Sequence, residues 1–293
     1  MKQHYINYIA ALLIFGSNGV VAGQIPLNSY EIVLLRTAIG IVMLWSIFAL
    51  TRQKVTAWQY RREFIFLALS GVMMGLNWLS LYEAFAQIGV SLGILACYCG
   101  PVLVMVLSPL LFREKLTWPK LLGFGVVLAG MVLCNGEIVV EGHSVWGVFC
   151  GAMACLTMAT LIVLNKKASH ITGLENTAWE MSFAFITVAL FVGSKEGFSF
   201  ICGIGHAWPW VLTLGIVNTG LGCYLYFSSI NRLPVQSVSI LGYLEPLSGV
   251  VLSMIFLHEQ MTPLQMLGAV CILGGAAFAE CYRGRGTKIK NAA

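Results

Sequence analysis

Two stretches of this 293-residue chain carry closely related sequences. The first, YCGPVLVMVLSPLLFREKLTWPKLLG, covers Tyr98–Gly123, and the second, YLEPLSGVVLSMIFLHEQMTPLQMLG, covers Tyr243–Gly268. Tyr243 follows Tyr98 by 145 residues, close to half of the chain. The same offset pairs Pro101 with Pro246, Glu114 with Glu259, Thr117 with Thr262, Gly123 with Gly268, and Gly130 with Gly275. The pattern is typical of a duplicated chain, and we predict two units, residues 1–140 and 141–293.

The composition indicates that these units fold in a lipid bilayer. The chain is 58% hydrophobic and only 10% charged, whereas soluble domains carry about 25% charged residues. A helix needs ~20 mostly apolar residues to cross ~30 Å of hydrocarbon. We therefore predict an all-α integral membrane protein. Its ten predicted transmembrane helices lie at residues 5–23, 30–50, 64–86, 91–112, 118–135, 145–164, 174–193, 207–230, 235–257 and 263–281.

The positive charges predict how the chain is oriented in the membrane. Of the 17 Lys and Arg residues, all but Lys195 and Arg36 lie in alternate loops or at the termini. Loops rich in Lys and Arg stay in the cytoplasm. We therefore expect a multi-pass protein of the cell membrane with both termini cytoplasmic. The net charge of +5 then reflects topology, and we expect the lipid bilayer, not nucleic acid, as the partner.

Five spans per unit is an odd number, so the second unit enters the membrane upside down relative to the first. The turn that holds Glu114 should face the cytoplasm, and the matching turn that holds Glu259 should face outside. Inverted-topology repeats are a common plan of secondary transporters, because one half-structure used in both directions presents two related shapes.

The repeated motif resembles the EamA family of the drug/metabolite transporter superfamily. A proline in the fourth span, the turn LSPLLFREKLT and a glycine-rich fifth span return as LEPL, HEQMT and LGAVCILGG. The stretches LLRTAIG around Arg36 and NWLSLYEAF from Asn77 are also similar to that family. The resemblance implies ten helices around a central cavity lined mainly by spans one, three, four, six, eight and nine. It also implies export of amino acids and related metabolites.

Two charged residues inside predicted spans are candidates for function. Glu245 lies ten residues into span nine, so ~1.5 Å per residue places it ~15 Å deep. An intramembrane carboxylate is expensive and indicates a functional site by default. It would bind a substrate ammonium group, accept a proton, or pair with a neighbouring helix; Gly100 takes the equivalent position in the first unit. Arg36 would balance Glu245, meet a substrate carboxylate, or extend its charge to the membrane interface. Because it lies in span two, which is not a cavity helix in the family, we favour a structural role for it.

Aromatic and amide side chains at depth predict a substrate site. Rings supply contact area and cation–π attraction for an amino acid or an amphipathic cation. The predicted substrate-binding residues are Asn18, Asn77, Trp78, Tyr82, Tyr98, Asn218, Tyr224, Tyr243 and Glu245. Trp118 lies at a span end, where aromatic rings form an interfacial belt. Pro101 and Pro246 each remove a helical hydrogen bond at matching positions, which suits a hinge, although a static kink gives the same pattern.

The function that this pattern predicts is secondary transport, most directly the export of an amino acid or related small metabolite by alternating access. Import of a small organic cation is the alternative, since the same fold permits either direction. A membrane-embedded enzyme is the least favoured class. No nucleophile–base set occurs at depth, and most of the nine cysteines lie in apolar runs as small apolar fillers. We expect no cofactor, no metal and no catalytic residue, a monomer or homodimer, and proton coupling if Glu245 titrates.

Overall fold

The computed structural model describes residues 2–53, 55–100, 103–104, 118–140, 145–168, 170–195, 197, 205–230, 233 and 241–287, a part of the chain that is helical and contains no strand. The first unit contributes α1 (Lys2–Gly16), α2 (Asn18–Gly23), α3 (Ser29–Leu50), the 3-10 turn η1 (Ala57–Gln59), α4 (Arg61–Ile88), α5 (Val90–Cys97) and α7 (Trp118–Val140). The second unit contributes α8 (Val145–Lys167), α9 (Gly173–Lys195), the 3-10 turn η3 (Gly205–Ala207), α10 (Trp208–Leu212), the π-helix η4 (Thr213–Leu221), α11 (Gly222–Ile230), α13 (Leu244–Phe256) and α14 (Pro263–Thr287).

Several of these helices are long and apolar enough to span a membrane. Five segments of the described chain meet that criterion: Lys2–Gly23, Ser29–Leu50, Arg61–Ile88, Val145–Asn165 and Gly173–Lys195. They correspond to predicted spans one, two, three, six and seven. Shorter apolar helical stretches, Leu121–Gly130, Leu244–Phe256 and Pro263–Phe278, fall in predicted spans five, nine and ten. The predicted all-α, multi-span membrane fold is confirmed.

Local sequence explains where the helices begin and end. Asn28 starts α3 with a reciprocal capping box, in which its side chain accepts a hydrogen bond from the Glu31 backbone N–H and Glu31 accepts one from the Asn28 N–H. Gly89 separates α4 from α5 with a φ of 86°, a left-handed conformation that glycine adopts without strain. The break predicted between the spans 64–86 and 91–112 therefore occurs at Gly89.

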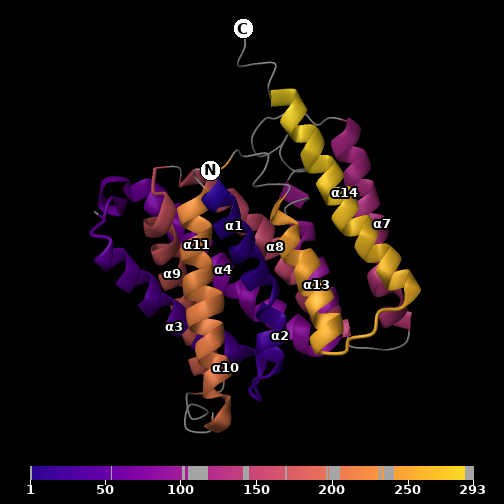
Figure 1. The fold of residues 1–293 in the computed structure, drawn as a ribbon, viewed down its shortest axis with the longest axis horizontal. Helices are drawn as coiled ribbons and strands as arrows, with labels where there is room; N and C mark the ends of the chain where they lie inside the picture. The colour runs from indigo at the N-terminus through magenta and orange to yellow at the C-terminus, as the bar shows by residue number, and fades with distance from the viewer. Residues whose placement is uncertain are drawn as a thin grey trace.

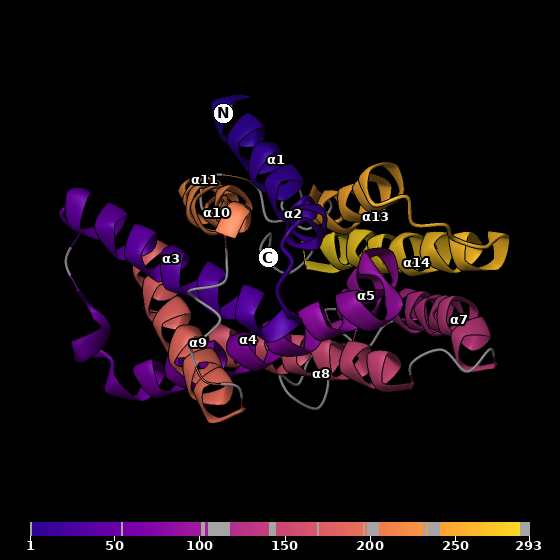
Figure 2. The ribbon, with the colours of Figure 1, turned by 90° about the horizontal axis from the view of Figure 1, so that it is seen from below.

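The two ends of the chain lie on the same side of the molecule. In Figure 1, the Lys2 end of α1 and the Thr287 end of α14 are both toward the top, and the connection between α13 and α14 is at the bottom. Helices α7 and α14 pack together along one flank, and α3 and α9 occupy the opposite flank (Figure 2). An even number of membrane crossings places both ends of a chain on the same face.

Helices of each unit pack against helices of the other unit. Helix α4 of the first unit packs against α8 and α9 of the second. In the matching arrangement, α11 packs against α1, and η4 packs against α3. The third span of each unit therefore packs between the first two spans of the other unit, which is what a pseudo-two-fold relation between them requires.

Paired glycines mark the same relation between α7 and α14. A Cβ atom added at Gly130 would lie 2.7 Å from the carbonyl oxygen of Gly268, and one added at Gly275 would lie 3.1 Å from that of Gly123. The offset of the repeat matches Gly130 with Gly275 and Gly123 with Gly268, so these two contacts are the same contact seen from each unit. Small residues let helix backbones approach closely in a membrane, and here both repeats supply them.

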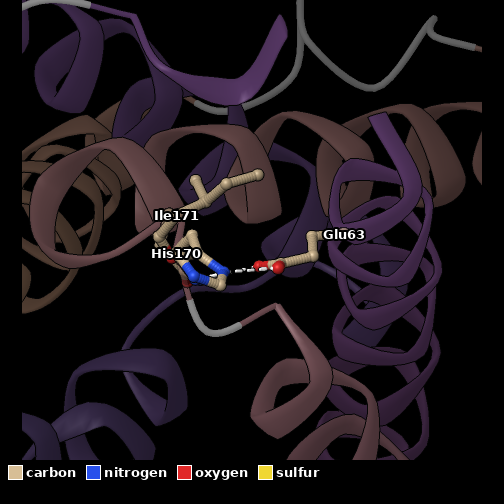
Figure 3. A network of polar contacts seen from close by, with 4 residues as sticks. Glu63, His170 and Ile171 are labelled. Carbon is tan, nitrogen blue, oxygen red and sulfur yellow. Dashed lines mark hydrogen bonds and ion pairs between the residues drawn. The ribbon is translucent and has the colours of Figure 1, made fainter. Parts of the chain in front are cut away.

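On each of the two opposite faces of the molecule, a carboxylate holds a loop between helices against a neighbouring helix. Glu63, in the first turn of α4, lies 2.5 Å from the Nδ1 atom of His170 and accepts a 2.8 Å hydrogen bond from the His170 backbone N–H (Figure 3). The His170 ring also stacks on Tyr60, with centroids 4.8 Å apart. These contacts hold the start of α4 against the connection that leads into α9.

At the opposite face, Glu259 caps a helix of the other unit. Its carboxylate accepts hydrogen bonds from the Val90 N–H at 2.6 Å, the Ser91 N–H at 3.0 Å and the Ser91 hydroxyl group at 2.6 Å. The first N–H groups of a helix have no partner within it, and negative charge is favourable there. Glu259 therefore ties the α13–α14 turn to the start of α5.

Candidate functional site

A cavity of about 80 Å³ lies between the α1–α2 break, α3, α4, α5 and the start of α13. In Figure 2, α2 and α4 lie near the middle of the molecule, and α3 runs toward them from the left flank. The cavity is lined by Phe15, Gly16, Asn18, Gly19, Arg36, Trp78, Leu81, Tyr82, Phe85, Ile94, Cys97, Tyr98 and Glu245. The lining therefore combines both signs of charge with aromatic and aliphatic surface.

Arg36 brings a positive charge into the cavity from α3. The side chain is only 4% exposed, and burying a cation is costly unless its N–H groups find partners. Its Nη1 atom donates a hydrogen bond to the Tyr82 hydroxyl group, and its guanidinium carbon lies 4.6 Å from the Trp78 ring centroid and 5.2 Å from that of Tyr82. Two aromatic rings on α4 thus hold the guanidinium group by cation–π contact.

Glu245 supplies the negative charge from the first turn of α13. Tyr98 and Arg36 line the same cavity. Pro246 is buried directly after it, in the first helical turn, where a missing N–H is tolerated. The turn at Tyr243 that precedes α13 matches the turn at Tyr98 that follows α5, so both units interrupt their helix at the equivalent residue.

A break in the first predicted span shapes one wall of the cavity. Residues 5–23 were expected to form one helix, but α1 ends at Gly16 and α2 begins at Asn18. The Ser17 hydroxyl group donates to the Ile14 carbonyl at 2.7 Å, and Asn218 from η4 donates to that same carbonyl at 2.7 Å and to the Ser17 hydroxyl at 2.8 Å. The break is therefore held by a side chain of the other unit, and it turns Asn18 toward the cavity.

Several predicted site residues lie elsewhere. Asn77 donates to the Ala154 carbonyl at 2.7 Å and to the Thr157 hydroxyl at 3.3 Å, which ties α4 to α8. Asn218 braces the Ser17 break, as described above. Tyr224 is 42% exposed, and Tyr243 packs against an apolar cluster built around α5, α7 and α14. These four are outside the cavity lining, and Pro101 is outside the described residues.

A second cavity of about 230 Å³ adjoins the first and shares Gly19, Tyr82 and Phe85 with it. Its remaining lining comes from the turn between α2 and α3 and from the ends of α4, α5 and α13: Ala22, Gly23, Ile25, Leu27, Ser29, Ile32, Ala86, Val90, Leu257 and Glu259. The two cavities therefore form a route from the centre toward the face that carries the α13–α14 turn.

On the other side of the central cavity, aromatic and aliphatic side chains pack together. Tyr8 and Tyr226 have ring centroids 5.3 Å apart, and Phe15 lies 5.9 Å from Tyr226. Leu12, which is also buried, belongs to the same cluster. The described part of the route is therefore packed toward the face that holds the Lys2 end of α1, and hollow toward the opposite face.

Comparison with known proteins then decides the family. Residues 4–136 and 145–280 each match the EamA-like transporter family. The chain belongs to the EamA-like transporter family. It is thus a multi-pass membrane protein of a transporter family, as the resemblance of its repeated motif implied.

Curated relatives of this EamA-like protein are similar over nearly their whole length. An uncharacterized transporter of Bacillus subtilis (strain 168), YxxF, is 25% identical over 282 residues, which cover 95% of this chain and 89% of that protein. A second, YetK of the same organism, is 28% identical over 92% of this chain and 84% of that protein. A solved crystal structure has the same fold, with a TM-score of 0.63 at 20% identity, and the match covers 97% of this chain and 99% of that chain.

Sequence reasoning missed the placement of Arg36 in this EamA-like cavity. We expected a structural role because span two is not a cavity helix in the family, but the structure brings the guanidinium group into the lining. A charge within an otherwise apolar span was the available signal. Within the described residues, no group of three or more His, Cys, Asp or Glu side chains gathers as a metal site would require.

Proposed function

We propose that this EamA-like protein is a secondary transporter that exports an amino acid or a related small metabolite by alternating access. The observation that carries the proposal is a central cavity lined by one cation, Arg36, and one carboxylate, Glu245. A zwitterion is a ligand that complements both charges. The aromatic and aliphatic lining around Trp78, Leu81 and Phe85 suits an apolar side chain.

Access to the cavity supports a transport cycle. The adjoining 230 Å³ cavity leads toward the face of the α13–α14 turn, which the distribution of Lys and Arg predicts to be outside. The cluster of Tyr8, Leu12 and Tyr226 packs the other side. We take this as an outward-facing state, and the inverted repeat supplies the opposite state by exchanging the packed side for the open one. In this orientation both termini are cytoplasmic and the protein resides in the cell membrane.

The competing functions fit the cavity less well. Import of an organic cation is disfavoured by Arg36, whose buried charge would repel a cation with no carboxylate. For an enzyme, the described lining offers one carboxylate, two tyrosines and one thiol, Cys97, whose hydrogen-bond donor is the Asn77 amide and not a base. Protonation of Glu245 in exchange for a substrate ammonium group would couple transport to a proton gradient.

Flux in proteoliposomes tests the proposal. Vesicles that contain the purified protein are loaded in turn with each of the twenty radiolabelled amino acids, and release is followed with and without a pH gradient. We expect saturable release of at least one of them, well above protein-free vesicles and inhibited by the same unlabelled amino acid. Release at the protein-free rate for all twenty would contradict the proposal.

A further inference from the structure

Two polar atoms in the cavity lining have no hydrogen-bond partner within the described chain: Nε of Arg36 and Oδ1 of Asn18. Both atoms are buried, and a buried donor or acceptor without a partner is costly, so native structures rarely leave one unmatched. One atom is a donor on a cation, and the other is an acceptor on a neutral amide. Their complement is a ligand that carries both an acceptor group and a donor group.

The Arg36 guanidinium group is held in a fixed position, and its Nε–H group has no partner in the described chain. The rings of Trp78 and Tyr82 pack against it, and the Tyr82 hydroxyl group accepts a hydrogen bond from Nη1. In the described part of the chain no ion pair joins Arg36 to a carboxylate. The planar fork of N–H groups on a guanidinium group matches the two oxygens of a carboxylate.

The opposite charge in the same cavity sets the direction of a bound ligand. Glu245 and the Tyr98 hydroxyl group come from α13 and α5, whereas Arg36 comes from α3. A ligand with an ammonium group and a carboxylate spans these walls, and its ammonium group also satisfies Oδ1 of Asn18. Its side chain then contacts the apolar lining of Leu81, Phe85 and Ile94.

We propose that Arg36 binds the carboxylate of the transported molecule while Glu245 and Asn18 bind its ammonium group. The cavity would thereby select amino acids over the amines and the acids that lack one charged group. This inference rests on the proposed function, because it takes the cavity as the transport site. If Arg36 served only to balance Glu245, replacing it would weaken all ligands alike.

Binding of three matched compounds to the purified full-length protein tests the assignment. L-leucine carries both groups, 3-methylbutylamine lacks the carboxylate, and 4-methylpentanoate lacks the amino group. Binding is read from the rise of the unfolding midpoint with ligand concentration. For Arg36→Gln we expect the affinity for L-leucine and 4-methylpentanoate to fall about 10- to 100-fold, the loss of one charge-assisted hydrogen-bonded pair. The affinity for 3-methylbutylamine should not fall.

Matched variants separate this role from effects on folding. Arg62→Gln also removes one positive charge, but from an exposed position at the start of α4, and it should bind all three compounds as the unmodified protein does. If Arg36→Gln does not fold, Arg36→Lys keeps the charge and loses the planar fork, and about a 10-fold weaker binding of 4-methylpentanoate is expected. Equal losses for acid and amine in the Arg36 variant that folds would overturn the proposal.

Sodium acetate and sodium chloride distinguish the failure of this inference from the failure of the proposed function. Suppose that acetate stabilises the unmodified protein, that Arg36→Gln abolishes or Arg36→Lys weakens this stabilisation, and that L-leucine does not bind. This result would keep the carboxylate subsite and reject L-leucine as a ligand. Stabilisation by chloride equal to that by acetate would identify a site for inorganic anions and overturn the carboxylate assignment. Equal stabilisation by acetate of the unmodified protein and of the Arg36 variants would also overturn the carboxylate assignment.

Discussion

At the scale of single residues, Glu245 provides the clearest test of function against structure. The first unit is built with Gly100 at the equivalent position, so the repeat does not need a carboxylate there in order to fold. Glu245→Gln keeps the shape and hydrogen-bonding capacity of the side chain and removes its charge. We expect this variant to insert and fold but to lose most transport, measured as flux in vesicles with and without a pH gradient. Flux equal to that of the unmodified protein in both conditions would make Glu245 a structural residue.

The aromatic residues of the cavity give a second prediction. Trp78 and Tyr98 line the cavity, whereas Trp118 is 75% exposed at the start of α7. Trp78→Ala and Tyr98→Ala should each reduce flux about 10-fold or more, since an aromatic contact in a desolvated site is worth about 0.5–2 kcal/mol beyond the area it buries. Trp118→Ala, compared at equal expression, should change flux little. Similar losses in all three variants would indicate that the rings act through stability.

Which face of a helix a polar residue occupies could be predicted only in part. Trp78 and Tyr82 are four residues apart and share a face, and both reach the cavity. Asn77 lies next to Trp78 on the same helix but points toward α8, because the Ala154 carbonyl and the Thr157 hydroxyl group offer its amide hydrogen bonds. Those partners belong to the other unit and are 77 and 80 residues away in sequence. The depth of a side chain in the membrane follows from counting residues along the helix, whereas the direction in which it points depends on the neighbouring helix.

At the scale of helices, the break in the first span also depends on a residue that is distant in sequence. No proline interrupts residues 5–23, so the apolar pattern alone predicts a continuous helix. Ser17 and the carbonyl of Ile14 are held by Asn218, which lies 201 and 204 residues away. The break at Gly89 was predictable because its counterpart in the second unit, NRLPVQ, has the composition of a turn. Breaks set by local composition can be found in the sequence, and breaks set by tertiary hydrogen bonds cannot.

The crossing of α1 and α13 beside the cavity depends on close backbone contact. A Cβ atom at Gly16 would lie 2.1 Å from the Ser248 hydroxyl oxygen and 2.9 Å from the Glu245 carbonyl oxygen. Gly16→Val should therefore push α13 away and destabilise the protein by about 1–3 kcal/mol, as overpacking typically does. Gly125→Val is the matched control, because nothing lies within 4 Å of a Cβ atom at Gly125. Thermal unfolding in detergent should show a lower midpoint for the Gly16 variant alone, and equal midpoints would contradict the close crossing.

At the scale of the whole molecule, the duplication explains why the fold was more predictable than the site. The offset of 145 residues is present in the sequence, and in the structure it relates Gly130 with Gly275 and the α4 contacts with those of η4 and α11. A symmetric relation constrains many contacts at once. The site departs from symmetry, since Glu245 has Gly100 as its counterpart. Its residues therefore had to be located one by one.

The last prediction tests the orientation on which outward access depends. The charge distribution predicts that Arg62, at the start of α4, faces the cytoplasm and that Ser194, at the end of α9, faces outside; both are exposed. Single cysteines are introduced at these positions in a background with Cys202→Ser and Cys281→Ser, because Cys202 lies in a loop that is predicted to face outside. Cys97, Cys99, Cys150 and Cys155 are buried, so their background labelling should be low.

A thiol reagent that cannot cross membranes, added to intact cells, should label Ser194→Cys and should label Arg62→Cys only after the cells are opened. The labelling measured on the background protein, without either introduced cysteine, defines the zero level. Because Arg62 lies in the first turn of α4 and Ser194 in the last turn of α9, the pair samples one helix of each unit, and the inverted repeat requires the two positions to face opposite sides of the membrane. Labelling of Arg62→Cys from outside, with Ser194→Cys protected, would reverse the orientation and make the 230 Å³ cavity an entrance from the cytoplasm. Labelling of both from outside would contradict the inverted topology itself.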